Sequence, residues 1–455
     1  MNFSNQLSSV RETIIACFSP DEVENNELGI RDFDAKAEEV QVQYDENNIT
    51  YICVGVGEDS SAIQYEEGLA LGIKKAIELK RDEISVVVPE TCLNSEIVSE
   101  IVVRASYSFD KYKSEKSHRF TEVDVVSYDH DMSDIDKGIC RGEAINYTRD
   151  LQNENANVVT PEYLINQCID IFENNENFDL DYIEGDTLGK KGLGLLEAVG
   201  RGSHLDSALI ILKYNGDLCS DEYTAVVGKG VTFDSGGHSL KPSDAMLDMR
   251  MDMSGAASVL GLMKFVADAQ PTENIIAVIP ACHNAISSTA FNVGDVCTSY
   301  SGKTVEIHNT DAEGRLILAD ALSYVVKNYE VERVVDIATL TGAIVVALGE
   351  NTAGLFSNND ELAEELFNAG EDCNERLWRM PLREEHRKAM KGERADLRNM
   401  SNIGRNCGST TASAFLENFV DDTPWCHIDI AGTAMNKKDG GTGFGTGLLI
   451  EWLVK

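Results

Sequence analysis

The sequence has no apolar run long enough to cross a membrane. Its longest apolar stretches, Ile275 to Cys282 and Ile337 to Leu348, fall short of the roughly 18 to 20 residues that a membrane-spanning helix needs. The N-terminus also has no basic segment followed by an apolar run and a small-residue cleavage site, which a secretory signal would have. We therefore expect a cytoplasmic protein with no membrane partner.

Closely spaced cysteine pairs are also missing. The eleven cysteines are scattered singly from Cys17 to Cys426, and none of them forms a C-x-x-C pair. This pattern argues against a zinc ribbon and against a disulfide framework. We expect reduced thiols with structural roles.

Basic residues are few compared with acidic ones. The chain has 39 Lys and Arg against 77 Asp and Glu, which gives a formal charge of −38. Binding to phosphate groups or anionic membranes depends on clustered Lys and Arg, so the composition disfavours nucleic acid as a partner. We interpret the excess of acid mainly as a source of solubility, with a salty cytoplasm as the alternative.

The length predicts two domains, because 455 residues exceed the roughly 250 to 300 at which a single core stops growing. In residues 1–140, apolar runs at 49–56 and 84–88 flank a helical pattern at 60–79. We predict a small, non-catalytic α/β domain there. The boundary is placed near residue 140, ahead of a helix predicted over Tyr163 to Phe172 from its Thr-Pro-Glu start signal.

Residues 141–455 alternate strand-like runs with helical patterns. The expected strands are Ala208 to Lys213, Thr224 to Val227, Ile275 to Ile279, Val334 to Ile337 and His427 to Ile430. The expected helices are Met253 to Ala269, Leu316 to Asn328 and Thr410 to Phe419. This alternation predicts a catalytic α/β domain with a mixed, largely parallel sheet covered by helices on both faces. Ligands of such sheets bind at the carboxyl ends of the strands.

Charged residues stand among glycines in two stretches, where small or apolar side chains would be usual. Lys229, Asp234 and Asp252 lie in the first stretch, and Asp311 and Glu313 lie in the second. Burying several carboxylates together costs many kcal/mol unless cations neutralise them, and two divalent ions would balance the four acids. The i, i+2 spacing of the second pair lets both side chains point the same way. We therefore predict a dinuclear metal site.

The expected ligands are mainly oxygen atoms, with no His or Cys among them. Such a set suits Mg²⁺, Mn²⁺ or Zn²⁺ and leaves the choice among these three open. Lys229 can be a ligand only as a neutral amine. Two adjacent dications would lower its pKa by charge repulsion, and desolvation would lower it further.

The octapeptide Asn309-Thr310-Asp311-Ala312-Glu313-Gly314-Arg315-Leu316 matches the signature of the leucyl aminopeptidase family of dinuclear metallopeptidases. The resemblance covers essentially the C-terminal two-thirds of the chain. It extends through Gly228-Lys229-Gly230, Phe233-Asp234-Ser235-Gly236-Gly237, Ser239-Leu240-Lys241-Pro242, Ala338-Thr339-Leu340-Thr341-Gly342-Ala343 and His427-Ile428-Asp429-Ile430-Ala431-Gly432-Thr433-Ala434. It implies an aminopeptidase that removes N-terminal amino acids, leucine and other apolar residues among them, from peptides.

The resemblance also implies a role for each matching residue. Asp234 and Glu313 would bridge the two ions, Lys229 and Asp252 would complete the tighter site, and Asp311 would complete the more exchangeable one. Lys241 and Arg315 would be the catalytic residues that bind no metal. Lys241 would stabilise the oxyanion, and Arg315 would hold a bicarbonate ion that acts as general base.

The family pattern further suggests which residues line the substrate cleft, and it implies a hexamer, a dimer of trimers. The cleft residues are Met249, Asn309, Ala312, Thr339, Leu340 and Gly342. Met249 would lie in the pocket for the first side chain, where a flexible thioether tolerates varied apolar groups. Alternate methionines from Met246 to Met253 are otherwise interpreted as packing residues.

Three positions depart from the family pattern. His238 replaces an apolar residue and is interpreted as a pocket-edge or packing residue, because the ligand set is already complete. Ser254 replaces a glycine and is expected to be a helix N-cap. His283 stands where an acid is frequent. These changes affect the expected specificity more than the expected mechanism.

Two other functions and a structural interpretation stay open at this point. Taken singly, each charged residue also has a structural interpretation. Asp252 could be a helix-start residue, Asp311 could be a turn former, and Lys229 could be an exposed residue at the end of a strand. A dinuclear site could also hydrolyse phosphoesters, although the acidic surface disfavours such substrates. DNA binding, known for some relatives of this family, is disfavoured by the charge of −38.

Overall fold

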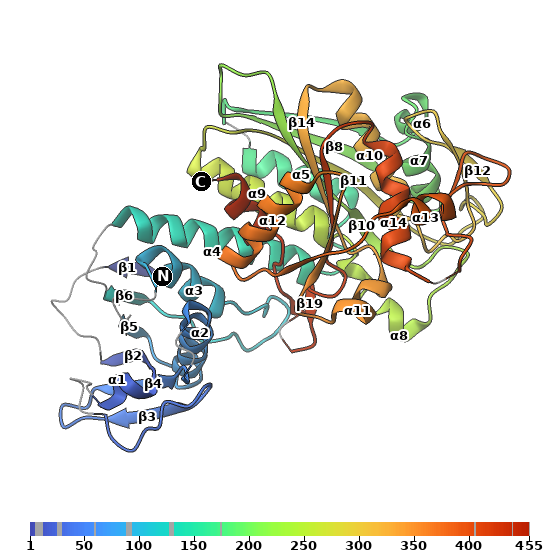
Figure 1. Cartoon of the computed structure of the whole chain (residues 1–455). Coiled ribbons are helices and arrows are strands. Elements are labelled where there is room, and N and C mark those ends of the chain that lie inside the picture. The colour runs from blue at the N-terminus through green and yellow to red at the C-terminus, as the bar shows by residue number, and fades with distance from the viewer. Residues whose placement is uncertain are drawn as a thin grey trace. The chain divides into compact units, whose positions relative to one another are not determined.

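The computed structural model describes residues 1–4, 12–24, 30–58, 61–87, 93–126, 132–172, 175–404, 406–438 and 440–454. They form two compact units, Met1–Asn146 and Tyr147–Lys455, and the division falls inside helix α4 (Met132–Asn153). Each unit is an α/β structure with its own main sheet (Figure 1). The predicted α/β class with a smaller and a larger domain is confirmed. The boundary near residue 140 and the non-catalytic role of the first domain stay predictions.

The N-terminal unit is built on a six-stranded sheet in the order β1-β6-β5-β2-β4-β3. Among the strand pairs that the structure describes in this sheet, β3–β4 is antiparallel and the others are parallel. The strands are β1 (Asn2–Ser4), β2 (Thr13–Phe18), β3 (Val40–Tyr44), β4 (Thr50–Gly55), β5 (Glu83–Val87) and β6 (Glu122–Val126). The helices besides α4 are α1 (Pro20–Glu24), α2 (Ala62–Glu78) and α3 (Ser95–Ala105). The predicted strands correspond to β4 and β5 and the predicted helix to α2, while Ser60 and Val88 lie outside the described residues.

The larger unit contains a nine-stranded mixed sheet in the order β16-β15-β18-β14-β9-β11-β8-β7, with β10 paired to β11 beside this path. The strands are β7 (Phe178–Glu184), β8 (Ala208–Asn215), β9 (Tyr223–Gly228), β10 (Gly230–Asp234), β11 (Asn274–Asn284), β14 (Val331–Ala338), β15 (Ala353–Ser357), β16 (Leu377–Arg379) and β18 (Trp425–Asp429). The central strands β10, β11, β9, β14 and β18 are mutually parallel. Antiparallel pairs occur toward the edges, where β8 joins β11, β7 joins β8, and β15 joins β18. The expected mixed, largely parallel sheet is confirmed.

Helices cover both faces of this sheet, with α9 and α12 to one side and α10 and α14 to the other (Figure 1). The helices and short 3-10 turns of the unit are α5 (Pro161–Phe172), α6 (Thr187–Lys190), α7 (Gly194–Gly200), α8 (Ser243–Met246), η1 (Met249–Met251), α9 (Ser254–Ala269), α10 (Gly314–Asn328), α11 (Gly342–Leu348), α12 (Asp360–Asp372), α13 (Glu384–Ala389), α14 (Gly408–Leu416), η2 (Glu417–Phe419) and α15 (Thr446–Leu453). The central strands are buried on both sides, so they read as continuous apolar runs. Two small sheets, β12 (Val296–Thr298) with β13 (Thr304–Glu306) and β17 (Leu397–Arg398), and β19 (Met435–Asn436) with β20 (Gly440–Gly441), complete the unit.

The described residues include neither a membrane-spanning helix nor a disulfide bond. None of the helices found there is long and apolar enough to span a membrane. The cysteines in the described ranges, from Cys17 to Cys426, are free thiols, and five of them are buried. The reduced state of the thiols and their structural roles stay predictions.

Candidate functional site

The predicted site residues gather where the parallel strands of the larger unit end. Lys229 directly follows β9, and Asp234 is the last residue of β10. Thr339 directly follows β14, and Asn284 and Asp429 are the last residues of β11 and β18. Since carboxyl ends of parallel strands meet at one edge, residues more than a hundred positions apart are brought together there.

Three buried carboxylates form the centre of the site. Asp234, Asp252 and Glu313 each offer an oxygen atom, and these oxygens lie within 4.8 Å of one another. Asp252 follows the turn η1, and Glu313 is the N-cap of α10. Asp252 Oδ2 and Glu313 Oε2 are buried without a hydrogen-bond partner. Buried acceptors without donors are costly, and oxygen atoms arranged in this way fit a divalent cation.

Lys229 is held inside this cluster. Its Nζ lies 2.7 Å from Asp252 Oδ1 and 3.1 Å from Glu313 Oε1, and it donates to the carbonyl oxygen of Thr339 at 2.8 Å. Burial alone would lower the pKa of Lys229, but the carboxylates of Asp252, Glu313 and Asp234 outweigh burial and raise this pKa. Two bound dications would act in the opposite sense, which is the condition for a lysine ligand.

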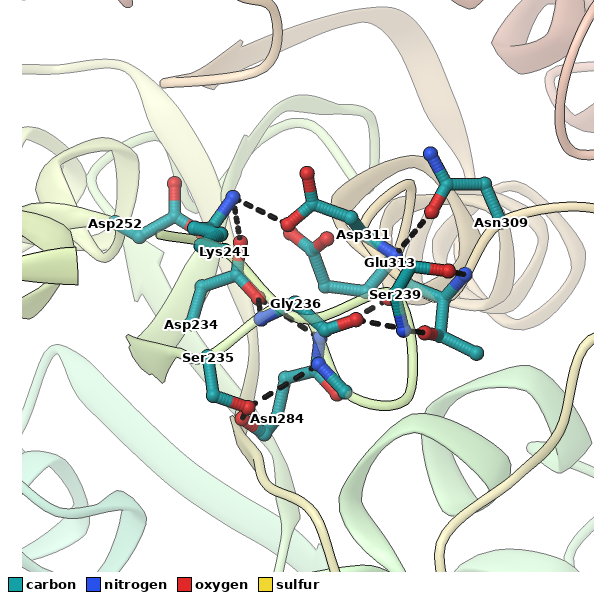
Figure 2. A network of polar contacts seen from close by, with 12 residues as sticks. Asp234, Ser235, Gly236, Ser239, Lys241, Asp252, Asn284, Asn309, Asp311 and Glu313 are labelled. Atoms are coloured by element: carbon teal, nitrogen blue, oxygen red, sulfur yellow. Dashed lines mark hydrogen bonds and ion pairs between the residues drawn. The ribbon is translucent and has the colours of Figure 1, made fainter. Parts of the chain in front are cut away.

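Lys241 forms ion pairs with Asp234, which belongs to the carboxylate cluster, and with Asp311. Its Nζ lies 2.7 Å from Asp234 Oδ2 and also forms an ion pair with Asp311, as the dashed lines in Figure 2 show. Burial and the charge of Glu313 raise the pKa of Asp234 to about 6. The Lys241 side chain is 16% exposed, against 3% for Lys229, so its ammonium is the one more accessible from solvent.

Glycines allow this close approach. Gly236 and Gly237 have positive φ angles of 85° and 60°, which favour glycine, and the N–H of Gly236 donates to Asp234 Oδ1 at 2.9 Å. At the start of α10, a Cβ on Gly314 would lie 2.5 Å from Lys229 Cε. The signature therefore needs glycine at this position so that the lysine can pass over the helix end.

A cavity of about 890 Å³ opens over the cluster. Its lining contains all five predicted metal ligands and Lys241, together with five of the six predicted cleft residues: Met249, Asn309, Thr339, Leu340 and Gly342. Ala312, the sixth, is buried and is not among the lining residues.

Arg315 is also buried beside the cavity rather than in its lining. Its Nη1 donates to the carbonyl oxygen of Asn399 at 2.8 Å, and its Nε is buried without a hydrogen-bond partner. Burial lowers the pKa of this guanidinium to about 10. The group stays charged at neutral pH and keeps donors for an anion.

None of the three departures from the family pattern is among the residues that line the cavity. His238 is exposed and is not among the residues that line the cavity. His283 packs its ring against Phe233 with centroids 5.6 Å apart, and burial lowers its pKa. The predicted N-cap role of Ser254 is wrong, because Met253 is the cap and Ser254 is the first residue of α9. The Ser254 hydroxyl instead donates to the carbonyl oxygen of Met251 at 2.6 Å.

Two buried polar residues beside the site were not identified from the sequence. Asn284 Nδ2 donates to Asp234 Oδ1 at 2.8 Å and to the carbonyl oxygen of Thr310 at 3.1 Å (Figure 2). Asp429 is fully buried and accepts hydrogen bonds from the loop that follows β14. In both cases a polar residue at the carboxyl end of an apolar strand was the signal that could have found it.

Proteins with similar sequences or structures include some named as probable cytosol aminopeptidases and one named as a maturation enzyme. Residues 146–450 match the family described as "Cytosol aminopeptidase family, catalytic domain". A "Probable cytosol aminopeptidase" of Chlamydia caviae is 40% identical over 94% of this chain and 90% of its own length. One of Fusobacterium nucleatum is 42% identical over 75% of this chain and 70% of its own. The solved structure "Bottromycin maturation enzyme BotP in complex with Mn" has a TM-score of 0.88 and 30% identity, and the match covers 97% of this chain and 98% of that one.

The peptidases of this family depend on metal ions. The buried carboxylates of the site could hold such ions, so the site and the family match point to the same chemistry. The chain belongs to the cytosol aminopeptidase family and is a metallo-aminopeptidase.

Proposed function

We propose that this protein removes the N-terminal amino acid from peptides with the help of two divalent metal ions. The supporting observation is the set of buried carboxylates at the floor of the cavity, two of which keep an oxygen atom without a donor. The proposed metal ligands are Lys229, Asp234, Asp252, Asp311 and Glu313. When bound, the ions would supply a Lewis acid for the scissile carbonyl and lower the pKa of a bound water.

The remaining charged residues are assigned to the reaction itself. Lys241 reaches the cavity and carries an ammonium suited to stabilise a developing oxyanion. Arg315 is assigned to bind bicarbonate as the general base, which is supported by its buried charge and its unpaired Nε. Asp234 and Glu313 would each be shared between the two ions.

The cavity wall supports a preference for leucine and other apolar first residues. Met249, Met251, Met400 and Met435 all line it, and thioethers adapt to side chains of different shape. The substrate would also contact the other predicted cleft residues that line the cavity, Asn309, Thr339, Leu340 and Gly342. Ala312 is buried and would support this wall without lining the cavity. The metals are proposed to be Zn²⁺, Mn²⁺ or Mg²⁺, the assembly a homohexamer, and the location the cytoplasm.

Hydrolysis of a chromogenic leucine amide tests this function. With Mn²⁺ the protein is expected to release leucine from the unblocked amide and to leave the N-acetylated amide intact. Chelation should stop the reaction, and Glu313→Gln should lower the rate about 100-fold or more because it removes a ligand charge. Asp372→Asn, in an exposed last turn of α12, is the matched control and should keep the wild-type rate.

Three outcomes would contradict parts of the proposal. No hydrolysis of any unblocked amino-acid amide across several divalent metals would remove the aminopeptidase function. Cleavage of a phosphoester without cleavage of peptides would replace it with another two-metal hydrolysis. A rate that does not respond to added bicarbonate in the wild type or in Arg315→Lys would remove the assignment of Arg315.

A further inference from the structure

The loop Thr339–Gly342 forms one wall of the cavity, and its position decides how a substrate can lie against the carboxylate cluster. The loop connects the carboxyl end of β14 to the start of α11, and all four of its residues line the cavity. A loop at this place needs fixed partners, because backbone groups that contact a substrate must be positioned before the substrate binds.

One side of the loop is attached to the carboxylate cluster. The carbonyl oxygen of Thr339 accepts a hydrogen bond from Lys229 Nζ at 2.8 Å, and Thr339 Oγ1 donates to Asp252 Oδ1 at 2.9 Å. These contacts hold only the first loop residue. They leave Leu340 to Gly342 to be fixed from elsewhere.

Asp429 fixes the other side. Strand β18 lies next to β14 with Ala338 and Asp429 in register, so the Asp429 side chain stands beside the loop as it leaves β14. Asp429 Oδ1 accepts from the backbone N–H groups of Leu340 at 3.1 Å and Thr341 at 3.3 Å. Asp429 Oδ2 accepts from Thr341 Oγ1 at 2.6 Å. Both carboxylate oxygens therefore hold the loop, and the group is fully buried.

The Thr341 hydroxyl is the centre of this attachment. It lies 2.6 Å from Ser409 Oγ on α14 and accepts from the backbone N–H of Ile344 at 3.3 Å, which caps α11. Because its one proton is donated to Asp429, the Ser409 hydroxyl must donate to Thr341. The loop is thus bound to β18, α14 and α11 through the side chain of one residue, and this residue belongs to the cavity lining.

We propose that Asp429 and Thr341 are positioning residues that set the Leu340–Gly342 wall for the substrate and thereby determine substrate affinity. The proposal rests on the aminopeptidase function given above. Neither residue belongs to the proposed metal ligands or to the residues assigned to proton transfer. Their loss should therefore weaken substrate binding while metal binding is retained.

Thr341→Val and Thr341→Ser separate this role from a general effect on folding. Valine keeps the shape and removes the hydroxyl, whereas serine keeps the hydroxyl. For leucine amide, Thr341→Val is expected to raise KM about tenfold with kcat within about twofold, since a hydrogen bond to a buried carboxylate is lost without loss of a reacting group. Thr341→Ser should restore KM to near the wild-type value, and the Mn²⁺ affinity of both variants, measured by calorimetry, should stay within about twofold of wild type.

Thr411→Val is the matched control. The Thr411 hydroxyl is also buried, but it donates to the carbonyl oxygen of Gly408 inside α14 and does not touch the loop. Its KM should not change. If Thr341→Val fails to fold, Ser409→Ala removes only the donor to Thr341 and should raise KM by a smaller, about threefold, factor.

The results distinguish this inference from the function on which it rests. An active wild-type enzyme whose KM is unchanged in folded Thr341→Val, or raised equally in Thr411→Val, would overturn the positioning role alone. A lower kcat with unchanged KM, or a large loss of Mn²⁺ affinity, would also overturn it. A wild-type protein inactive on every unblocked amide would overturn the proposed function and the positioning role together.

Discussion

Replacing Gly314 with alanine is expected to disable the site by displacing Lys229. The new Cβ would lie 2.5 Å from Lys229 Cε and 2.7 Å from Nζ, whereas ordinary contact begins at 3.4 Å. The lysine side chain must therefore give way by about 0.9 Å. It has little freedom to do so, because its ammonium lies 2.7 Å from Asp252 Oδ1 and 3.1 Å from Glu313 Oε1.

The expected magnitudes follow from these distances. Overpacking a buried site costs about 1 to 3 kcal/mol, and alanine in place of glycine in a helix contributes about 0.5 to 1 kcal/mol in the opposite direction. The free energy of unfolding should fall by about 1 to 2 kcal/mol. A 1 Å displacement of an active-site group can cost about 100-fold in rate, so kcat/KM should fall by about that factor.

Urea unfolding, Mn²⁺ calorimetry and hydrolysis of leucine amide would be measured on the same preparations. Gly189→Ala in α6 is the matched control, because the nearest atom to its Cβ would be Glu197 Cγ at 3.7 Å, an ordinary contact. It should have wild-type activity and a free energy of unfolding that is equal to the wild-type value or about 0.5 to 1 kcal/mol higher. A Gly314→Ala protein with wild-type Mn²⁺ affinity and wild-type activity would refute the reasoning that Lys229 needs this space.

Asn284→Ala is expected to weaken Mn²⁺ binding about 10- to 100-fold, because Asn284 orients Asp234 through a 2.8 Å hydrogen bond. Calorimetry would measure this loss, the exposed Asn292→Ala is the control, and an unchanged affinity would contradict the orienting role. Hydrogen bonds from His308 and from the backbone N–H groups of residues 393–395 lower the pKa of Glu306 to about 2. Ionised Glu306 therefore stabilises the folded state fully above pH 4.5, and this contribution is lost as the pH falls toward 2. Urea unfolding at pH 7 and pH 3 should show a larger loss of stability in wild type than in Glu306→Gln, and equal losses would rule out this assignment.

The sequence predicted the central strands well, because strands buried on both faces leave continuous apolar runs. The expected runs at Thr224 to Val227, Ile275 to Ile279 and Val334 to Ile337 correspond to β9, β11 and β14. The antiparallel pairing of β8 with β11 and β7, and of β15 with β18, was not predicted, since strand direction depends on chain path and not on the local pattern. The N-cap prediction at Ser254 was wrong because α9 begins at Ser254 itself, one residue earlier than a cap at this position implies, shortly after the turn η1.

The site was predictable to the extent that its chemistry lies in two short segments. Charged residues among glycines identified Lys229, Asp234 and Glu313, which the structure brings together. Asn284 and Asp429 were missed because their partners are a carboxylate and backbone groups about 50 and 90 positions away. A polar residue at the carboxyl end of an apolar strand marks such a position, but the local sequence does not show which distant group the residue contacts.

The strand order also has a consequence for the time at which the enzyme becomes competent. The segments that carry the proposed ligands and the cavity loop are all synthesised before β18. However, β14, which leads into the loop, pairs in parallel with β18 and therefore needs a strand that is synthesised later. Until Trp425–Asp429 has been made, β14 has an open edge and the loop after it has no carboxylate to hold its N–H groups. Because pairings between distant strands form slowly, we expect a nascent chain to contain every proposed metal-binding side chain and still have no peptidase activity until β18 has joined the sheet.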